Sequence, residues 1–203
     1  MKIICVGKNY GDHVKEMRGD LPSEPVIFMK PDTALLSAGR PFYIPDFSAE
    51  IHHEIEVVVK ICRDGKNIGE KFSSGYYNEL SVGIDFTARD LQHRFKSAGH
   101  PWELSKAFDG SAAVGEMLPV AAESNIYALQ FMLKKNGLVV QGGNTKDMIF
   151  SVEKIIAFVS RYITLRKGDI LFTGTPAGVG PVQPGDFLEG FIGSKKLLEI
   201  KIK

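Results

Sequence analysis

The sequence contains few cysteines and no long apolar run. Only two of its 203 residues are cysteine, Cys5 and Cys62, and both stand among apolar neighbours without the spacing of a disulfide framework. We therefore expect reduced thiols in a cytoplasmic protein. Uninterrupted apolar runs are short, as at 57–59, whereas a membrane-spanning helix needs about 18 such residues. We expect neither a membrane span nor an export signal, since no basic flank precedes an apolar stretch at the N-terminus.

The sequence also lacks an excess of charge of either sign. Its 25 lysines and arginines balance 24 acidic residues and leave a net charge of +1, which creates no field to attract polyanions or anionic lipid. We expect no nucleic-acid partner and no membrane partner. The Cys and His spacings of zinc sites are absent, and so is a glycine-rich nucleotide-binding motif.

The sequence contains many short β-type segments and enough apolar residues for one hydrophobic core. With 44% apolar residues, the chain is long enough for one sizeable core and too short for two comfortable domains, so we expect a single catalytic domain over 1–203. Runs rich in β-branched and aromatic residues predict the strands. These runs cover 3–6, 26–29, 55–61, 80–86, 129–134, 138–141, 170–172, 187–192 and 197–202. The predicted fold class is α+β and β-rich, with few short helices.

Turn residues predict two hairpins. The pair Asn136-Gly137 separates two β-type runs, and because both residues tolerate positive φ it favours a two-residue type I′ turn. A second hairpin is expected to turn near Gly193-Ser194.

Capping residues predict three helices. The first begins with Asn9 as its cap and ends at Gly19, and the second begins at Thr87 and ends before Gly99. Ser151 opens the third, whose apolar residues follow the i, i+3, i+4 spacing of a buried stripe. That stripe consists of Val152, Ile155, Ile156, Val159 and Ile163.

Two acids in the run HHEIEVVVKI face the same way. Strand alternation places Glu54 and Glu56 on one face with Val58. Residues two apart on a strand lie about 6.6 Å apart, so both carboxylates can converge on one cation. The alternative is a strand with a solvated acidic face. Asp85, at the end of an apolar run, is either a turn residue or a third ligand. Three carboxylates fit Mg²⁺ or Mn²⁺ and leave positions for water or substrate.

A second group of residues has acid–base potential. His13 and Glu16 lie three apart on the first predicted helix and share a face, so the carboxylate can orient the imidazole as a general base. The alternative is a solvated helix surface. Lys106 stands among apolar residues, where it can stabilise an oxyanion or merely extend its ammonium to solvent. The stretch GDILFTGTPAGVGPV is either a glycine-rich turn that receives an anion or an ordinary turn.

Six segments, in order, carry a family resemblance. They are GKNYGDHVKEM, PVIFMKPDTAL, HHEIEVVV, GIDFTARDLQ, LSKAFDG and GDILFTGTPAGVGPV, and the match around them runs from Cys5 to about Gly190. Together they resemble the fumarylacetoacetate hydrolase family, and most closely its short acylpyruvate hydrolase and oxaloacetate decarboxylase type. The resemblance implies a mixed β roll of the family's C-terminal domain type, few helices and a homodimer.

The resemblance also assigns roles by position. It implies metal ligands at Glu54, Glu56 and Asp85, a base and its orienting partner at His13 and Glu16 on a lid helix, and a cation at the reacting centre at Lys106. Substrate contacts are implied at Lys8, Arg89, Gln92 and Thr175. Relatives often carry Arg where Lys8 stands, and an ammonium does not bind a carboxylate in bidentate fashion. The larger hydrolases have a further acidic ligand before the histidine, but residues 1–8 contain no acid.

The expected activity is Mg²⁺-dependent hydrolysis of a C–C bond in acylpyruvates, such as acetylpyruvate or fumarylpyruvate, with a small 2-oxo acid as the only partner besides the second subunit. The alternative is an oxaloacetate decarboxylase or 2-hydroxydienoate isomerase that uses the same metal site. A third possibility is a non-catalytic relative that binds metal and ligand, and the presence of His13, Glu16 and Lys106 argues against it.

Overall fold

The computed structural model describes residues 1–120 and 125–203. Its strands are β1 (Ile3–Gly7), β2 (Val26–Lys30), β3 (Ile51–His53), β4 (Ile55–Ile61), β5 (Tyr77–Asp85), β6 (Thr87–Ala88), β7 (Ala112–Val114), β8 (Leu118–Pro119), β9 (Gln130–Lys135), β10 (Leu138–Asn144), β11 (Ile170–Phe172), β12 (Gly180–Pro181), β13 (Phe187–Ile192) and β14 (Lys195–Lys201). Its α-helices are α1 (Gly11–Glu16), α2 (Arg89–Ala98), α3 (Glu103–Lys106) and α4 (Val152–Tyr162).

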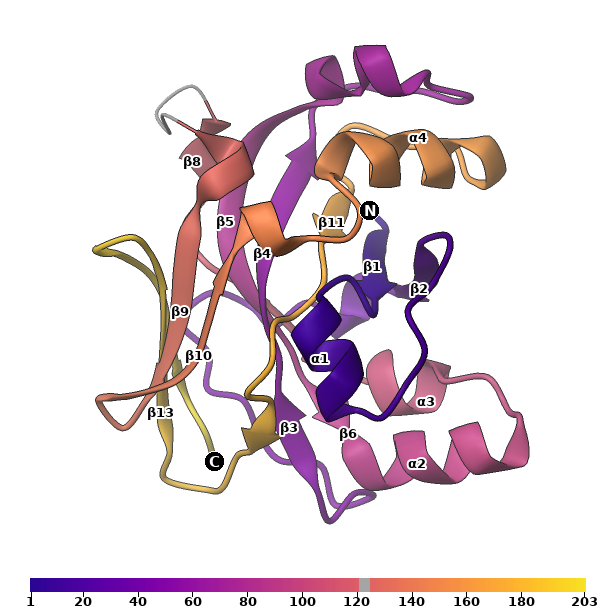
Figure 1. Ribbon diagram of the computed structural model, residues 1–203. Coiled ribbons are helices and arrows are strands. Elements are labelled where there is room, and N and C mark those ends of the chain that lie inside the picture. The colour runs from indigo at the N-terminus through magenta and orange to yellow at the C-terminus, as the bar shows by residue number, and fades with distance from the viewer. Residues whose placement is uncertain (121–124) are drawn as a thin grey trace.

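These strands form three sheets. The largest has the order β2-β1-β11-β4-β5-β7, with β8 also paired to β5. It is mixed, because β1 and β11 run parallel while β4 pairs antiparallel with both β11 and β5. A second sheet has the order β10-β9-β13-β14, and a third the order β12-β3-β6. In Figure 1, α3 lies to the right of the lower part of α1 with α2 beneath it, whereas α4 lies at the opposite, upper end of the molecule.

The alternation of β4 divides the core between the two faces of the large sheet. Val57 and Val59 belong to the main apolar cluster, which also contains Leu133 of β9 and Ile155 of α4. Val58 faces the other way, into a smaller cluster that includes Cys5 and Phe172. Because Glu54 and Glu56 share the face of Val58, the acidic residues lie on the side of the smaller cluster. This alternation is what positions the candidate site.

The predicted strands and hairpins are confirmed. Each of the nine runs corresponds to a strand, with ends that differ by no more than a few residues. Leu138 pairs with Lys135 across the first turn, and Asn136 and Gly137 both have positive φ, 54° and 82°. Ile192 pairs with Lys195 across the second. The strands β3, β6, β7, β8 and β12 have no more than three residues each and were not predicted.

Of the predicted caps, Ser151 is confirmed and two others are wrong. The Ser151 hydroxyl accepts a hydrogen bond from the Lys154 amide at the start of α4. Asn9 does not cap α1, because its amide is buried and bonds to backbone groups of Phe150 and Thr173 instead. Thr87 does not cap α2, because it lies in β6 and its hydroxyl accepts from Lys106.

The structure also tests the predicted helix ends, the state of the cysteines and the fold class. Gly99 ends α2 in the left-handed conformation, as its position predicts. The first helix is shorter than predicted and ends at Glu16. Cys5 and Cys62 are both free thiols, and burial raises the pKa of the Cys5 thiol well above its usual value. Among the described residues, no helix has the length and apolar character needed to cross a membrane. The architecture is α+β, as predicted.

Candidate active site

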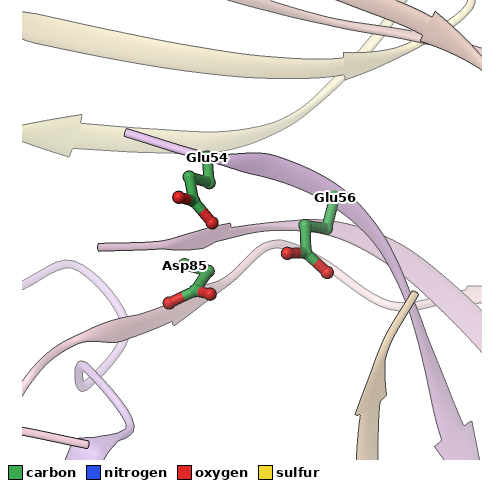
Figure 2. A group of neighbouring side chains, drawn as sticks. All are labelled: Glu54, Glu56 and Asp85. Atoms are coloured by element: carbon green, nitrogen blue, oxygen red, sulfur yellow. The ribbon is translucent and has the colours of Figure 1, made fainter. Parts of the chain in front are cut away.

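Three buried carboxylates meet on one face of the large sheet. Glu54 immediately precedes β4, Glu56 is its second residue, and Asp85 ends the neighbouring strand β5. One oxygen from each lies within 4.8 Å of the others. Figure 2 shows the three carboxylates close together, with Glu54 and Glu56 on one stretch of chain and Asp85 beside them. An all-oxygen donor set of this kind suits a hard divalent cation.

Buried cations neutralise two of the three acids. Lys106 Nζ lies 2.7 Å from Glu54 Oε2 and 2.6 Å from Asp85 Oδ2, and Lys30 Nζ lies 2.8 Å from Asp85 Oδ1. Arg89 Nη2 lies 2.5 Å from Glu54 Oε1. Although burial by itself raises the pKa of Glu54, Lys106 and Arg89 hold it well below its usual value. Burial likewise opposes the charge of Lys106, but Asp85 and Glu54 raise its pKa.

Glu56 differs from the other two acids. It has no ion-pair partner in the described part of the chain, and its carboxylate accepts a hydrogen bond of 2.6 Å from the Gly174 amide. Burial, Asp85 and Glu54 raise the pKa of Glu56 well above its usual value. The nearby Lys106 only partly offsets this effect, and a divalent cation among the three carboxylates would supply the positive charge that an ionised Glu56 needs. The residues present therefore fit such a metal.

His13 and Glu16 form a hydrogen-bonded pair beside the acids. They project from α1, and His13 Nδ1 lies 3.1 Å from Glu16 Oε2. His13 is buried, whereas Glu16 is partly exposed. The second oxygen of Glu16 accepts a hydrogen bond of 3.0 Å from the Gly178 amide. The glycine-rich stretch thus receives an anion, although the anion is a side chain of the protein itself.

A cavity of about 370 Å³ joins these groups. Its lining contains every residue assigned a role in the sequence analysis except Glu16, which contacts the lining residue His13 by a hydrogen bond. Gln92 accepts a hydrogen bond of 2.6 Å from Arg89. The Thr175 hydroxyl donates to the Ile55 carbonyl, so its proton is directed at the backbone and not at the cavity. A larger hollow of about 510 Å³ along β14 contains only one acid, Glu199, and offers no comparable chemistry.

Comparison with known proteins identifies the family. The model of the fumarylacetoacetate hydrolase C-terminal domain matches residues 2–200, nearly the entire chain. The chain belongs to the fumarylacetoacetate hydrolase family.

Family members with different activities resemble this chain. It is 42% identical over 201 residues to mitochondrial oxaloacetate tautomerase FAHD1 of Mus musculus, a match that covers 99% of this chain and 91% of the relative. It is 41% identical over 188 residues to oxaloacetate tautomerase YcgM of Escherichia coli, with 92% and 86% covered. Fumarylpyruvate hydrolase from Pseudomonas aeruginosa, solved in complex with Mn²⁺ and pyruvate, is 34% identical, with a TM-score of 0.93 and coverage of 100% and 89%.

Sequence reasoning missed three residues of this site. Lys30, whose ammonium contacts Asp85 and the Lys106 carbonyl, alternates with buried Phe28 on β2, and that pattern is the signal that could have found it. Lys96 lines the outer part of the cavity. Gln141 lies on β10, far from the family motifs in sequence, and no local pattern distinguishes it.

The helix α1 is expected to exchange its amide protons rapidly in the absence of ligand. Of its six residues only His13 and Val14 are buried, so few apolar contacts stabilise it. Hydrogen exchange over Tyr10–Arg18, measured before and after addition of Mg²⁺ and pyruvate, should show protection that rises with ligand. Strong, ligand-independent protection of this segment would exclude a lid.

Proposed function

We propose that this protein is a divalent-metal-dependent enzyme acting on 2-oxo acids that carry a second carboxylate, and that its principal reaction is the keto–enol tautomerisation of oxaloacetate. The observation that carries the proposal is the buried carboxylate triad beside the His13–Glu16 pair, in a cavity whose outer part holds uncompensated cations. The tautomerase names of relatives with 41–42% identity support the choice of reaction.

Glu54, Glu56 and Asp85 would hold the cation, Mg²⁺ or Mn²⁺. When bound, such an ion supplies Lewis acidity that polarises the oxygens of a 2-oxo acid. The Mn²⁺ and pyruvate of the fumarylpyruvate hydrolase structure support this role for the site. Arg89 and Gln92 lie at the same end of the cavity and offer hydrogen-bond donors to the substrate's C1 carboxylate.

His13 would move a proton between C3 and the C2 oxygen of oxaloacetate. The C–H bond at C3 breaks as the imidazole takes the proton, and the O–H bond of the enol forms when it is returned at the oxygen. Glu16 fixes the tautomer by accepting from Nδ1, which leaves Nε2 of His13 as the catalytic atom.

Lys106 would stabilise negative charge on the substrate oxygen. In this structure its ammonium makes three hydrogen bonds, to Glu54, Asp85 and Thr87, which use all three of its protons. Lys106 must therefore release one of these partners before it can donate to substrate. Charge taken over from Glu54 or Asp85 on metal binding would permit that release.

Cations at the outer end of the cavity support a dicarboxylate substrate. Arg89 and Lys106 are paired with acids, but Lys8, Arg18 and Lys96 have no ion-pair partner within 1–120 and 125–203. Partial burial lowers the pKa of Lys96, and the positive charges of Arg89, Lys106 and Lys8 lower it further. A carboxylate at C4 of the substrate would relieve this repulsion, whereas the neutral tail of acetylpyruvate would not.

Acylpyruvate hydrolysis is the second candidate. The same His13–Glu16 pair can take a proton from water as the water attacks a distal carbonyl. The activity named for the Pseudomonas relative supports this reaction, and fumarylpyruvate also carries a distal carboxylate.

Kinetic assays of purified protein with Mg²⁺ test the proposal. We expect the decay of the enol absorbance of oxaloacetate to accelerate in a Mg²⁺-dependent manner, with a higher kcat/KM than for cleavage of fumarylpyruvate or acetylpyruvate. Faster cleavage of either acylpyruvate than tautomerisation would establish the second candidate. Activity on oxaloacetate that survives removal of divalent ions by EDTA would contradict the metal requirement.

Lys96→Met is expected to lower kcat/KM for oxaloacetate about tenfold, because a charge-assisted contact at a partly exposed site is worth about 1–2 kcal/mol. The rate with neutral acetylpyruvate should change less than about twofold, since Met keeps the packing of the lysine stem. Lys195→Met, at an exposed lysine that begins β14 and does not line the cavity, is the matched control. Equal losses on both substrates would remove Lys96 from substrate selection.

A further inference from the structure

A buried glutamine links the elements of the site. Gln141 is the only buried residue of β10, whose other side chains are exposed or half-buried. The pairing of β10 with β9 shifts register between Val139 and Gln141, at an irregularity that re-aims the side chains. A buried amide costs free energy unless its polar atoms are bonded. The partners of Gln141 therefore indicate why a polar side chain occupies this position.

The Gln141 amide uses its full hydrogen-bonding capacity. Its Oε1 accepts from the Ile55 amide at 3.0 Å and lies 2.9 Å from His53 Nδ1. Its Nε2 donates to Thr175 Oγ1 and to the Pro176 carbonyl, both at 3.0 Å. One side chain thus joins two segments that are far apart in the sequence.

Each of these segments carries part of the candidate site. His53 and Ile55 flank Glu54, so the acceptor side of the amide holds the His53 side chain on one side of a proposed metal ligand and the Ile55 backbone amide on the other. Thr175 and Pro176 belong to the glycine-rich loop 174–178. At one end of this loop the Gly174 amide donates to Glu56, and at the other the Gly178 amide donates to Glu16.

The loop fits closely against β10. Gly178 has a φ of +99°, which L side chains rarely adopt, and a Cβ there would lie 2.7 Å from the Val140 carbonyl. The position of the Gly178 amide is therefore set by β10 as well as by the Gln141 side chain.

We propose that Gln141 is a positioning residue that sets the distance between the metal-binding carboxylates and the Gly178 amide that receives Glu16. By this means it fixes the position of α1 and the orientation of His13 beside the acids. The roles of the acids and of His13 rest on the proposed function, whereas the coupling of Gln141 to α1 does not depend on which reaction is catalysed.

The substitution Gln141→Glu tests the donor contacts of the amide separately from its acceptor contacts. The carboxylate still accepts from Ile55 and His53, but it cannot donate to Thr175 and Pro176. With Mg²⁺ and pyruvate bound, we expect amide protection over Tyr10–Arg18 to fall at least tenfold while protection of α4 is unchanged. The Mg²⁺ dissociation constant should change less than about threefold, because the Glu54 backbone keeps its support. The kcat for oxaloacetate should fall on the order of 10- to 100-fold, as for other outer residues that orient a site.

A double variant distinguishes positioning from general destabilisation. If Gln141 acts through Gly178 and Glu16, Gln141→Glu combined with Glu16→Ala should lower kcat no more than about twofold below Glu16→Ala alone. Gln130→Glu, the same change at an exposed position of β9, is the matched control. If Gln141→Glu does not fold, Thr175→Val takes its place. It removes the hydroxyl that accepts from Gln141 Nε2 and should lower the amide protection of α1 in the same way.

Three results would overturn the proposal. They are unchanged protection of α1 in both Gln141→Glu and Thr175→Val, equal loss of protection in α1 and α4, and additive losses of kcat in the double variant. If wild-type protein shows ligand-dependent protection of α1 but no turnover of oxaloacetate or acylpyruvates, the proposed function fails while the exchange measurements still test Gln141.

Discussion

Replacing Glu56 by glutamine is expected to weaken Mg²⁺ binding by at least about 10²-fold and to abolish activity, while the metal-free protein becomes more stable. Residues that only hydrogen-bond to the ligands of a metal already contribute 10- to 100-fold to its affinity, so the loss of a charged ligand should weaken binding at least as much. Glutamine keeps an oxygen to accept from the Gly174 amide but removes the charge.

The gain in stability follows from the pKa of Glu56. Burial and the charges of Asp85 and Glu54 raise that pKa in the folded protein. A carboxyl group of this kind opposes folding increasingly as the pH rises above its unfolded pKa of about 4.3. The advantage of Glu56→Gln should therefore be largest at neutral pH and shrink toward pH 4. A gain of about 1 kcal/mol in the free energy of unfolding of the variant over the parent would raise Tm by about 2–4 °C for a chain of this size.

Calorimetric titration with Mg²⁺ and thermal unfolding with and without the ion check this prediction. Glu70→Gln, a change of the same charge at an exposed residue, is the control. A variant that binds Mg²⁺ like the parent would remove Glu56 from the metal site. A variant that loses both binding and metal-free stability would indicate a structural role instead.

His13→Ala is expected to lower the rates of oxaloacetate tautomerisation and acylpyruvate cleavage by on the order of 10² to 10⁴, the usual contribution of a positioned base. Both reactions need a proton to be moved by a side chain. Decarboxylation of oxaloacetate needs no such base and depends chiefly on the cation, so it should be less affected. The variant therefore discriminates between base catalysis and substrate positioning.

All three rates should be measured on one preparation at saturating Mg²⁺, with the Mg²⁺ affinity determined separately. His93→Ala, at an exposed histidine of α2 that does not line the cavity, serves as the control. Equal losses in tautomerisation, cleavage and decarboxylation would assign His13 a lid or positioning role, and the base assignment would be dropped.

Local patterns were sufficient to predict the parts of the fold that depend on local physics. The alternation of β4 placed Glu54 and Glu56 on one face because side-chain direction is fixed by strand geometry alone. The Asn136-Gly137 turn was equally accessible, since positive φ at both positions is a property of those two residues.

Features set by long-range contacts could not be predicted in this way. Asn9 has the composition of a cap, yet its amide is used by Phe150 and Thr173, more than 140 residues away. The short strand β3 exists because β12 and β6 lie on either side of it. Gln141 resembles any polar residue of a half-exposed strand until its partners near Glu54 and Thr175 are known.

Part of the candidate site could be predicted from the sequence. Spacing suggested the acid pair and the His13–Glu16 pair, but each had a simpler alternative until the family resemblance connected them. The neutralisation of Asp85 by Lys30 required the fold, because β2 and β5 are not neighbours in the large sheet. The fold also shows that Lys106 is occupied by acids, which changes what this residue must do before it can contact substrate.

The most direct test of the proposed metal site is anomalous diffraction from crystals soaked with Mn²⁺ and pyruvate. We expect one strong anomalous peak within coordination distance of Glu54, Glu56 and Asp85, with pyruvate density on the side of His13 and Arg89. A Mn²⁺ peak only at other residues, or pyruvate bound in the cavity with no metal between the three carboxylates, would contradict the proposed site.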